Sequence, residues 1–491
     1  MNGDGQSDRS VVPANPPNKA EAAEAGEERE RTKGNAAGET RPGRSAGSGV
    51  SSDLDRVRQV AVRDKEARFT ALLHHVTLDS LWAAYAAIKP DAAPGVDGVT
   101  WEAYGQVQDL RVNLTDLHER VQQGRYRASP SRRAYIPKAD GRLRPLGIAT
   151  LEDKIVQRAV VKVLSAIYEA DFKGFSYGFR PGKNQHQALD ALAAGISTRR
   201  VNWVLDADIR DCFGQLDRAW LMTFLRHRIA DERVLRLISK WLAAGVLEDG
   251  SLTQSEKGSP QGASVSPLLA NVYLHYVFDL WADWWRNRRA RGEMILTRFA
   301  DDFIVGFEEK EDADRFLDEL RGRFAAFGLE LHPDKTRLIE FGRNASWHRK
   351  ARDLGKPETF DFLGFTHICA RSRRGRFWVK RITIAKRMQA KLHEVKDQLR
   401  RRMHLPIPDQ GRWLAQMING HMQYYAVPGN TRAISAFRSQ IIRYWLKTLR
   451  RRSHKDRITW KRMYRIADRW LPPARVKHPF PQDRFAAAHP R

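Results

Sequence analysis

The hydrophobic pattern changes character several times along the 491-residue chain. Residues 1–52 contain no Leu, Ile, Phe, Tyr or Trp and are rich in Gly, Ala, Glu, Arg, Ser and Pro. Such a composition cannot form a hydrophobic core, so we expect a disordered tail here. From Leu54 onward apolar residues recur at helical spacing, which predicts one or two amphipathic helices and a helical extension over residues 53–130.

The central stretch mixes short β-prone runs with helical ones. Residues 133–137 and 144–148 are strand-like, and Asp140-Gly141 between them is typical of a hairpin turn. Further strands are predicted at residues 203–209, 296–299 and 303–307, and helices at residues 219–247, 268–285 and 313–327. This mixture predicts an α+β domain.

The last quarter of the chain is helical and strongly basic. Beyond residue 383 no strand is predicted, and the apolar spacing indicates helices at residues 384–404, 410–425 and 431–451. Residues 371–491 carry 31 Lys and Arg against 6 Asp and Glu, so nearly all of the net charge of +27 lies there. A basic excess of this kind typically neutralises a polyanion such as nucleic acid or an anionic membrane.

Composition excludes several classes of protein. No stretch approaches the roughly 18 consecutive apolar residues of a membrane span, and no apolar signal-peptide core opens the chain. We therefore expect a soluble intracellular protein with no membrane partner. Cys212 and Cys369 are the only cysteines, too few for a disulfide framework or a zinc cluster. Any metal should then be a hard ion held by carboxylates.

Acidic residues stand where predicted strands end. Asp301 and Asp302 lie between two β-prone runs, which predicts a hairpin with two carboxylates at its tip. Such a pair often only decorates a solvated turn. A second apolar strand, however, runs into Asp206, Asp208 and Asp211. If the two pair, one Asp of this strand joins Asp301 and Asp302 to bind two Mg²⁺ ions about 3.5–4 Å apart, the arrangement for in-line phosphoryl transfer.

Seven short motifs resemble those of group II intron reverse transcriptases and occur in the same order. The segment from Asp208 to Phe213 resembles motif A, and Phe-Ala-Asp-Asp at residues 299–302 resembles motif C, with Phe in place of the commoner Tyr. Residues 257–269 resemble motif B, and the remaining motifs lie at residues 136–148, 177–182, 328–336 and 362–365. The resemblance implies a right-hand polymerase of fingers, palm and thumb, followed by an all-helical maturase domain.

This resemblance assigns roles to the acidic residues. Asp208 stands five positions before Phe213 and becomes the metal ligand of motif A. With Asp301 and Asp302 it completes a catalytic set for two Mg²⁺ ions. Phe213 becomes a steric gate whose ring excludes a 2′-hydroxyl and favours dNTPs, the alternative being an ordinary core aromatic.

Four further residues are expected near the incoming nucleotide. Lys138 and Arg144 bracket the hairpin turn and are expected at the triphosphate, with a merely solvated face as the alternative. Gln261 of motif B is expected to line the nascent base pair, beside two glycines that permit close backbone approach. The alternative is a structural turn before a helix. By resemblance, Lys335 is expected near the pyrophosphate leaving group.

The basic C-terminal segment resembles the thumb and maturase domain of the same family. Arg443, Lys447, Arg450 and Arg451 recur along one predicted helix as a basic stripe, which predicts an RNA-binding surface. Aromatic residues interleave with this stripe, and we expect most of them in the core and one or two stacked on RNA. They are Tyr424, Tyr425, Trp445, Trp460, Tyr464 and Trp470.

The resemblance implies a bacterial, cytoplasmic and nucleoid-associated RNA-directed DNA polymerase. Its expected partners are dNTPs, the group II intron RNA whose splicing it assists, and target DNA with its primer–template, on which target-primed cDNA synthesis supports intron mobility. We expect fingers and palm at residues 131–370, a thumb and maturase domain at 371–478 and a basic tail at 479–491. No His/Cys cluster of an HNH endonuclease is seen after Pro481, so priming is expected from an existing DNA end or nascent strand.

Two alternatives stay open. The chain could be chiefly a splicing chaperone with a vestigial polymerase, although intact carboxylates, motif B and fingers argue against this. It could also be a polymerase derived from group II introns and recruited for host repair or phage defence.

Overall fold

The computed structural model describes residues 48–106, 109–137, 143–248, 251–253, 258, 262–452 and 458–488. Helix α2 begins at Ser48, before Leu54, so helical structure extends into the segment expected to be a tail. Residues 1–47 of that expected tail lie outside the described residues. The N-terminal helices pack around α6 (Leu151–Asp171). They are α2 (Ser48–Arg63), α3 (Leu78–Ala86), α4 (Trp101–Gln106) and α5 (Leu110–Gln122).

The predicted hairpin opens the first sheet, whose strand order is β2-β1-β4-β5. Strands β1 (Ser131–Pro137) and β2 (Leu143–Ile148) are antiparallel, with Ile136 opposite Arg144. The turn expected at Asp140-Gly141 lies outside the described residues. Strand β4 (Val246–Glu248) pairs parallel with β1, and β5 (Ser251–Thr253) pairs antiparallel with β4.

The prediction of one helix over residues 219–247 was wrong. The chain forms α9 (Arg218–Arg228) and α10 (Glu232–Ala243), and then strand β4. Asp231 separates the helices because its carboxylate caps α10 by accepting a hydrogen bond from the Arg233 amide. Gly245 ends the helical run with a φ of 72°. Neither break interrupts the apolar spacing on which the prediction rested.

The central sheet, called the palm sheet below, has the strand order β6-β7-β3-β8 and is antiparallel throughout. Its strands are β3 (Trp203–Asp208), β6 (Met294–Phe299), β7 (Asp302–Phe307) and β8 (Arg337–Glu340). Leu205 and Phe303 belong to the main core with α13 (Lys310–Ala326), whereas Val204 and Ile304 belong to a second core with α7 (Gln185–Thr198). The α+β prediction is confirmed, because the helices pack on a sheet that is antiparallel throughout and is not built from parallel βαβ units.

The helix predicted over residues 268–285 is one continuous helical element with a wider turn inside it. Helix α11 (Ser266–Leu274) passes through a π-helical turn at His275–Asp279 into α12 (Leu280–Arg288). The side chains of all five residues in this turn are buried. Because a π turn has one more residue than an α-helical turn, it rotates the later side chains around the helix axis. The direction of the Asp279 side chain, at the end of this turn, depends on that rotation.

A third sheet, of order β11-β10-β9, links the palm sheet to the C-terminal helices. Strands β9 (Phe360–Phe362), β10 (Phe365–Arg371) and β11 (Phe377–Thr383) follow α14 (Ala345–Ala351). β10 and β11 form a hairpin with Phe365 opposite Thr383. The domain boundary expected at residue 370/371 falls at the end of β10, inside this hairpin.

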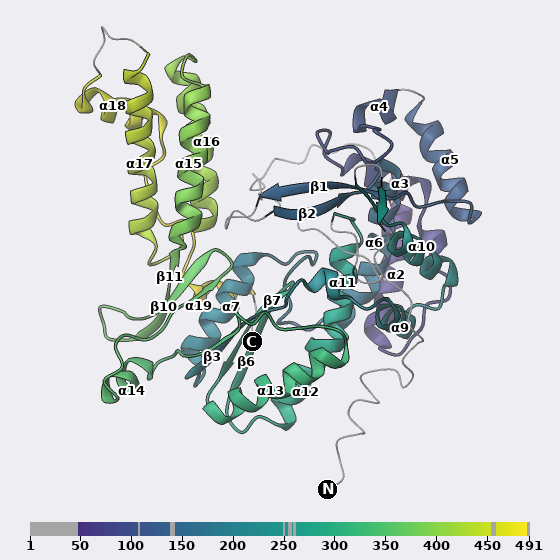
Figure 1. The fold of residues 1–491 in the computed structure, drawn as a ribbon, viewed down its shortest axis with the longest axis horizontal. Helices are drawn as coiled ribbons and strands as arrows, with labels where there is room; N and C mark the ends of the chain where they lie inside the picture. The colour runs from purple at the N-terminus through teal and green to yellow at the C-terminus, as the bar shows by residue number, and fades with distance from the viewer. Residues whose placement is uncertain are drawn as a thin grey trace.

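Three C-terminal helices stand as a column beside the β1–β2 hairpin (Figure 1). They are α15 (Ala385–Arg401), α16 (Ile407–Tyr425) and α17 (Thr431–Arg450), which confirms the three predicted helices. Helix α18 (Trp460–Trp470) packs against α16 and α17. Gln410 is fully buried in this column and accepts a 2.7 Å hydrogen bond from the Trp445 indole.

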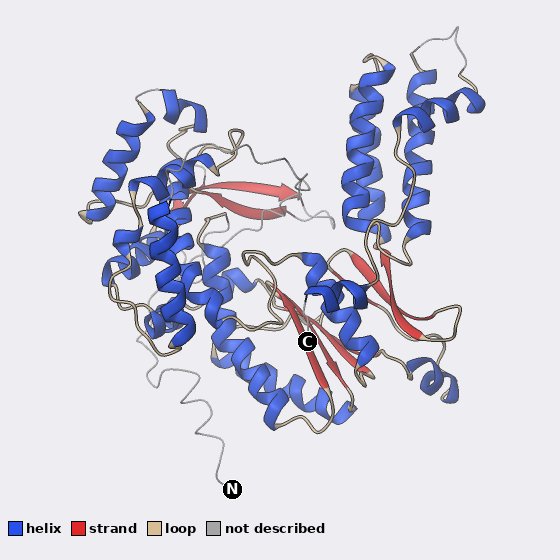
Figure 2. Ribbon diagram, turned by 180° about the vertical axis from the view of Figure 1, so that it is seen from behind, coloured by secondary structure: helices blue, strands red, loops and turns tan. Residues whose placement is uncertain are grey.

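The segment after residue 478 was expected to be a basic tail, and its described part is instead a helix. Helix α19 (Pro481–Ala488) packs on α7, behind the palm sheet in Figure 1 and in front of it in Figure 2. Arg484 forms an ion pair with Asp190, whose other oxygen accepts a 3.0 Å bond from Arg381 of β11. The prediction failed because the docking partner, α7, lies about 290 residues earlier in the chain.

Candidate active site

Two of the predicted carboxylates lie side by side on adjacent strands of the palm sheet. β3 pairs with β7 so that Asp208 lies directly opposite Asp302. Directly opposed residues of antiparallel strands have Cβ atoms about 4.5–5.5 Å apart. Asp301 occupies the two-residue turn between β6 and β7, immediately before Asp302. The backbone therefore brings together the three acidic residues that the sequence singled out.

The turn that carries Asp301 has an unusual backbone. Ala300 adopts a φ of 57°, in the left-handed region that a residue with a Cβ rarely enters. Gly178 packs against it so closely that a Cβ at Gly178 would lie 2.3 Å from the Ala300 nitrogen. The glycine of the motif at residues 177–182 thus makes room for the turn, and surrounding contacts must hold the turn in place.

Arg298 supplies the main contact of this kind. Its guanidinium is fully buried and donates to the Ala300 carbonyl at 2.9 Å and to the Asn271 side-chain oxygen at 3.0 Å. The Asn271 amide in turn donates to the Gly178 carbonyl at 2.8 Å. Asp279, at the end of the π-helical turn, accepts the remaining hydrogen bonds of the Arg298 fork. Sequence reasoning missed all three polar residues, because nothing in their spacing distinguishes them from surface positions.

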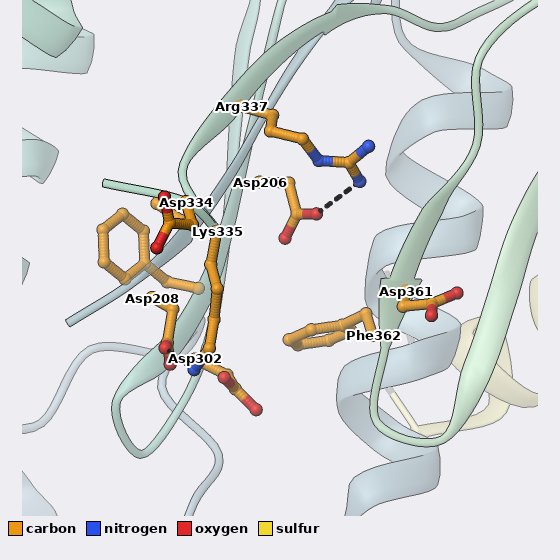
Figure 3. Close-up of a pocket in the computed structure, with 10 residues that line it drawn as sticks. Asp206, Asp208, Asp302, Asp334, Lys335, Arg337, Asp361 and Phe362 are labelled. Carbon is orange, nitrogen blue, oxygen red and sulfur yellow. Dashed lines mark hydrogen bonds and ion pairs between the residues drawn. The ribbon is translucent and has the colours of Figure 1, made fainter. Parts of the chain in front are cut away.

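Lys335 lies beside the predicted metal ligand. Its ammonium forms an ion pair with the Asp208 carboxylate, and the nearby His332 amide donates to the Asp208 carbonyl at 2.8 Å. Figure 3 shows the Lys335 side chain reaching toward both Asp208 and Asp302. The sequence placed Lys335 near a leaving group, and the structure places it at the carboxylates that would bind the metal.

A cavity of about 290 Å³ opens beside these residues. Arg337 donates to Asp206 at 3.2 Å within it, and Asp361 and Phe362 of β9 form the opposite wall (Figure 3). Burial raises the pKa of Asp206 to about 6, although Arg337 opposes the shift. Asp361 was not predicted. Arg337 was not predicted either, because it is the first residue of β8 and Lys335 lies in the turn before that strand.

The donors suit a hard divalent cation. Carboxylate oxygens are preferred by Mg²⁺, and the Lys335 ammonium already compensates the charge of Asp208. A metal ion at Asp208 would therefore have to displace the Lys335 ammonium or share the carboxylate with it. In the described part of the chain, no three His, Cys, Asp or Glu side chains are arranged to hold a metal ion.

Other predicted nucleotide contacts are placed only in part. Phe213 lies in the short helix α8 (Cys212–Gln215) with 7% of its surface exposed, packed in the main core. Burial raises the pKa of the Cys212 thiol, and the nearby Asp301 carboxylate raises it further. Arg144 is half-buried on β2. Lys138 and Gln261 lie outside the described residues.

The close approach predicted for motif B is present. Gly262 has a φ of 126°, and a Cβ there would lie 2.1 Å from the carbonyl oxygen of Gly147 in β2. Only glycine fits such a contact. Motif B therefore rests on the hairpin strand that carries Arg144.

The predicted RNA-binding residues are exposed on α17 and at its C-terminal cap, Arg451. Arg443, Lys447, Arg450 and Arg451 all face solvent, although Arg450 also donates to the Ile458 carbonyl at 2.9 Å. Of the interleaved aromatics, Trp445 is fully buried, whereas Trp460 and Tyr464 are 41% and 53% exposed. Tyr424, Tyr425 and Trp470 are half-buried and pack against the cores, which agrees with the expectation that most of the aromatics lie in the core. Stacking of one or two of them on RNA stays a prediction.

Comparison with known proteins decides the family. Residues 136–367 match the family described as reverse transcriptase (RNA-dependent DNA polymerase). Protein YkfC of Escherichia coli strain K12 is 33% identical over 352 residues, which cover 64% of this chain and 87% of YkfC. The group II intron-encoded protein LtrA of Lactococcus lactis subsp. cremoris is 32% identical over 224 residues. This chain belongs to the group II intron-type reverse transcriptases.

The coverage of the individual relatives differs. The match to LtrA covers 45% of this chain and 37% of LtrA. An uncharacterized 91 kDa protein in the cob intron of Schizosaccharomyces pombe is 35% identical over 190 residues, or 38% of this chain and 23% of that protein. The expected class, an RNA-directed DNA polymerase and maturase of group II introns, is confirmed. Enzymes of this reverse transcriptase family have the right-hand fold, use divalent metal ions and act on nucleic acid. The described helices include none with the length and apolar content of a membrane span.

Proposed function

We propose that Asp208, Asp301 and Asp302 hold two Mg²⁺ ions with which the enzyme adds dNTPs to a DNA 3′ end on an RNA template. The single observation that carries this proposal is the pairing of Asp208 with Asp302, next to the turn that holds Asp301. Bound Mg²⁺ would lower the pKa of the attacking 3′-hydroxyl and neutralise the leaving pyrophosphate.

The residues around the carboxylates have separate tasks in this proposal. Lys335 compensates Asp208 before substrate arrives and then contacts the phosphates that enter with the metal. Lys138 and Arg144 bind the triphosphate from the fingers, and Gln261 lines the nascent base pair. Phe213 limits the space at the 2′ position of the sugar. Arg298 acts on neither the metal nor the nucleotide directly, and it positions the turn that carries Asp301.

We also propose that the helices from α15 to α18 form the thumb and the maturase domain. Arg443, Lys447, Arg450 and Arg451 bind the group II intron RNA and assist its splicing, and target DNA with its primer occupies the space between thumb and fingers. In support, these four side chains are exposed in a segment with 31 basic and 6 acidic residues. Target-primed cDNA synthesis then supports intron mobility.

Primer extension with separate Asp208→Asn and Asp302→Asn proteins tests the catalytic proposal. Each substitution removes a charge that an amide cannot replace, so both proteins should lose Mg²⁺-dependent cDNA synthesis yet remain folded. Asp314→Asn is the matched control, because Asp314 is half-exposed on α13, where it pairs with Lys310 one helical turn away. Near-normal extension by either active-site variant would refute the assignment.

A further inference from the structure

Helix α18 carries two aromatic side chains on the outside of the molecule. Trp460 and Tyr464 stand one helical turn apart, with ring centroids 5.5 Å apart and planes inclined by 29°. They are 41% and 53% exposed, while Met463 and Ala467 on the adjoining face of α18 are fully buried. The core therefore already has its anchors on this helix, and the exposed aromatic pair is not needed to attach it.

Basic side chains extend the exposed face of α18. Lys461, Arg462, Arg465 and Arg469 are all exposed. At 100° per residue they follow the aromatic pair around one side of the helix, opposite the buried face. The acidic residue of α18, Asp468, is paired with Arg438 at 3.2 Å. The face defined by Trp460, Tyr464, Arg462, Arg465 and Arg469, called the α18 face below, thus combines flat rings with positive charge.

A hollow of about 440 Å³ lies along the arginine side of this face. Its wall on α16 is fixed, because Gly411 packs against the Trp470 ring so closely that a Cβ would lie 2.6 Å from it. The hollow is within the usual size range of small-molecule sites, so it has room for a nucleotide. Its lining residues are Ile407, Pro408, Arg462, Arg465, Ile466, Arg469 and Trp470.

The position of α18 separates this face from the β1–β2 hairpin. Figures 1 and 2 both show α18 at the outer side of the helical column, with α15 and α16 between it and the β1–β2 hairpin. A primer–template lying between the column and the hairpin would therefore not reach the α18 face.

We propose that the α18 face binds single-stranded RNA, with bases stacked on Trp460 and Tyr464 and phosphates on Arg462, Arg465 and Arg469. Exposed aromatic rings stack on unpaired bases of any identity, whereas bases inside a duplex are not available to them. Arginine adds bidentate phosphate contacts. This inference rests on the proposed intron RNA-binding function and assigns to α18 the contacts with unpaired RNA.

The test measures binding of the full chain to a labelled 10-nucleotide single-stranded RNA by fluorescence anisotropy. Trp460→Ala with Tyr464→Ala should weaken binding about 5- to 150-fold, the range for losing one to three kcal/mol of stacking. Trp460→Phe with Tyr464→Phe keeps both rings and should bind within a few-fold of wild type. Trp347→Ala, which removes a tryptophan that is 69% exposed on α14, is the matched control and should have no effect.

A charge variant tests the arginines independently of the rings. Arg462→Gln, Arg465→Gln and Arg469→Gln together should flatten the dependence of log affinity on log salt by about 0.7 for each phosphate that the protein no longer neutralises. Extension of a short preformed primer–template should stay at the wild-type rate in both α18 variants. Circular dichroism confirms that each protein is folded.

The outcomes separate this inference from the proposed function. If the double alanine variant binds like wild type while Arg443→Gln with Lys447→Gln loses binding, the α18 assignment is overturned and the RNA-binding function of α17 stands. If the loss is equal for single-stranded and double-stranded RNA, stacking on unpaired bases is overturned. A wild-type protein with no affinity for single-stranded RNA overturns both.

Discussion

The Arg298 guanidinium donates to both carboxylate oxygens of Asp279, at 2.7 and 2.6 Å, and neither side chain is exposed to solvent. Arg298 is the second residue before the turn position Ala300, and Asp279 ends the π-helical turn. This ion pair connects the helix that follows motif B to the turn that carries Asp301. The geometry of the turn that carries Asp301 is therefore set partly by Asp279, in the helical element that packs on the palm sheet.

Arg298→Lys should reduce catalysis more than it reduces folding. Lysine keeps the charge but cannot reproduce the fork that reaches Asp279, Asn271 and Ala300 together. A displacement of the turn by about 1 Å is enough to lower kcat about 100-fold. Primer extension gives kcat per folded molecule, and thermal unfolding gives stability.

The control for this variant is Arg228→Lys. Arg228 is equally buried, pairs with Asp171 at 3.0 Å and donates to the Asp64 and Ala67 carbonyls in the loop that follows α2. It should lose stability with little loss of kcat. Equal loss of kcat in both variants would show that Arg298 has no special connection to the catalytic turn.

Lys335→Ala should lower the Mg²⁺ concentration needed for half-maximal activity. The ammonium competes with metal for Asp208, and an ion pair of this exposure contributes about 0.2–1 kcal/mol, so the shift should be a few-fold at most. The maximal rate should fall, because Lys335 is proposed to contact the phosphates as well. Lys310→Ala, an exposed lysine of α13, is the control for loss of positive charge. An unchanged Mg²⁺ requirement would contradict the competition.

Asp206→Asn should alter how stability depends on pH. Burial raises the pKa of Asp206 from 3.8 to about 6, so the folded state retains a proton that the unfolded state loses above pH 4. Wild-type stability should therefore fall relative to the variant between pH 4 and 6 and run parallel to it above pH 6. The accumulated difference is at most about 3 kcal/mol. Urea unfolding of both proteins across this range measures it, and parallel curves throughout would contradict the shift.

Phe213→Val should increase incorporation of rNTPs relative to dNTPs. Removing the ring opens space for the 2′-hydroxyl, and discrimination should change about tenfold or more, as for other pocket-size changes. Single-nucleotide addition measures the ratio, and Phe213→Tyr, which keeps the ring, serves as the control. Since Phe213 is only 7% exposed, unchanged discrimination with reduced stability would assign it to core packing alone.

The exposed basic residues of α17, Arg443 and Lys447, should contribute to RNA binding and not to primer extension. Arg443→Ala with Lys447→Ala should weaken intron RNA binding and flatten the log-log salt slope by about 1.4, from two phosphate contacts. Arg450 is left out because its bond to the Ile458 carbonyl supports the chain leading into α18.

A double Asp301→Asn, Asp302→Asn protein should still bind the RNA and promote splicing. Loss of splicing by that folded protein would refute the division into two surfaces.

Local pattern predicted the parts of the site that depend on strand alternation. The Asp301-Asp302 pair and the acidic run from Asp206 to Asp211 could be located because apolar strands run into them. The resemblance then selected Asp208, and strand pairing brings it opposite Asp302. The three helices of the C-terminal column were likewise visible in their apolar spacing. Such features are encoded by residues close in sequence.

Contacts between distant segments could not be predicted in the same way. Asp279 meets Arg298 only because a π turn rotates the helix, and apolar periodicity does not reveal a single wider turn. Asp361 lines the cavity from β9, which belongs to the third sheet and not to the palm sheet. Its position therefore depends on how that separate sheet is placed. The docking of α19 depends on one buried carboxylate, Asp190, which in the sequence looks like any polar residue of a helix.

Asp190 also bears on how the helical column can move. Arg381 reaches it from β11, where the chain enters the column, and Arg484 reaches it from α19, after the chain has left. The column is thus fastened at both its entrance and its exit to one point on α7. Large domain swings need a few linker residues that absorb the change in backbone angles. With both linkers tethered together, we expect the column to rock about its base, so that its distance from the β1–β2 hairpin changes through tilt and not through separation.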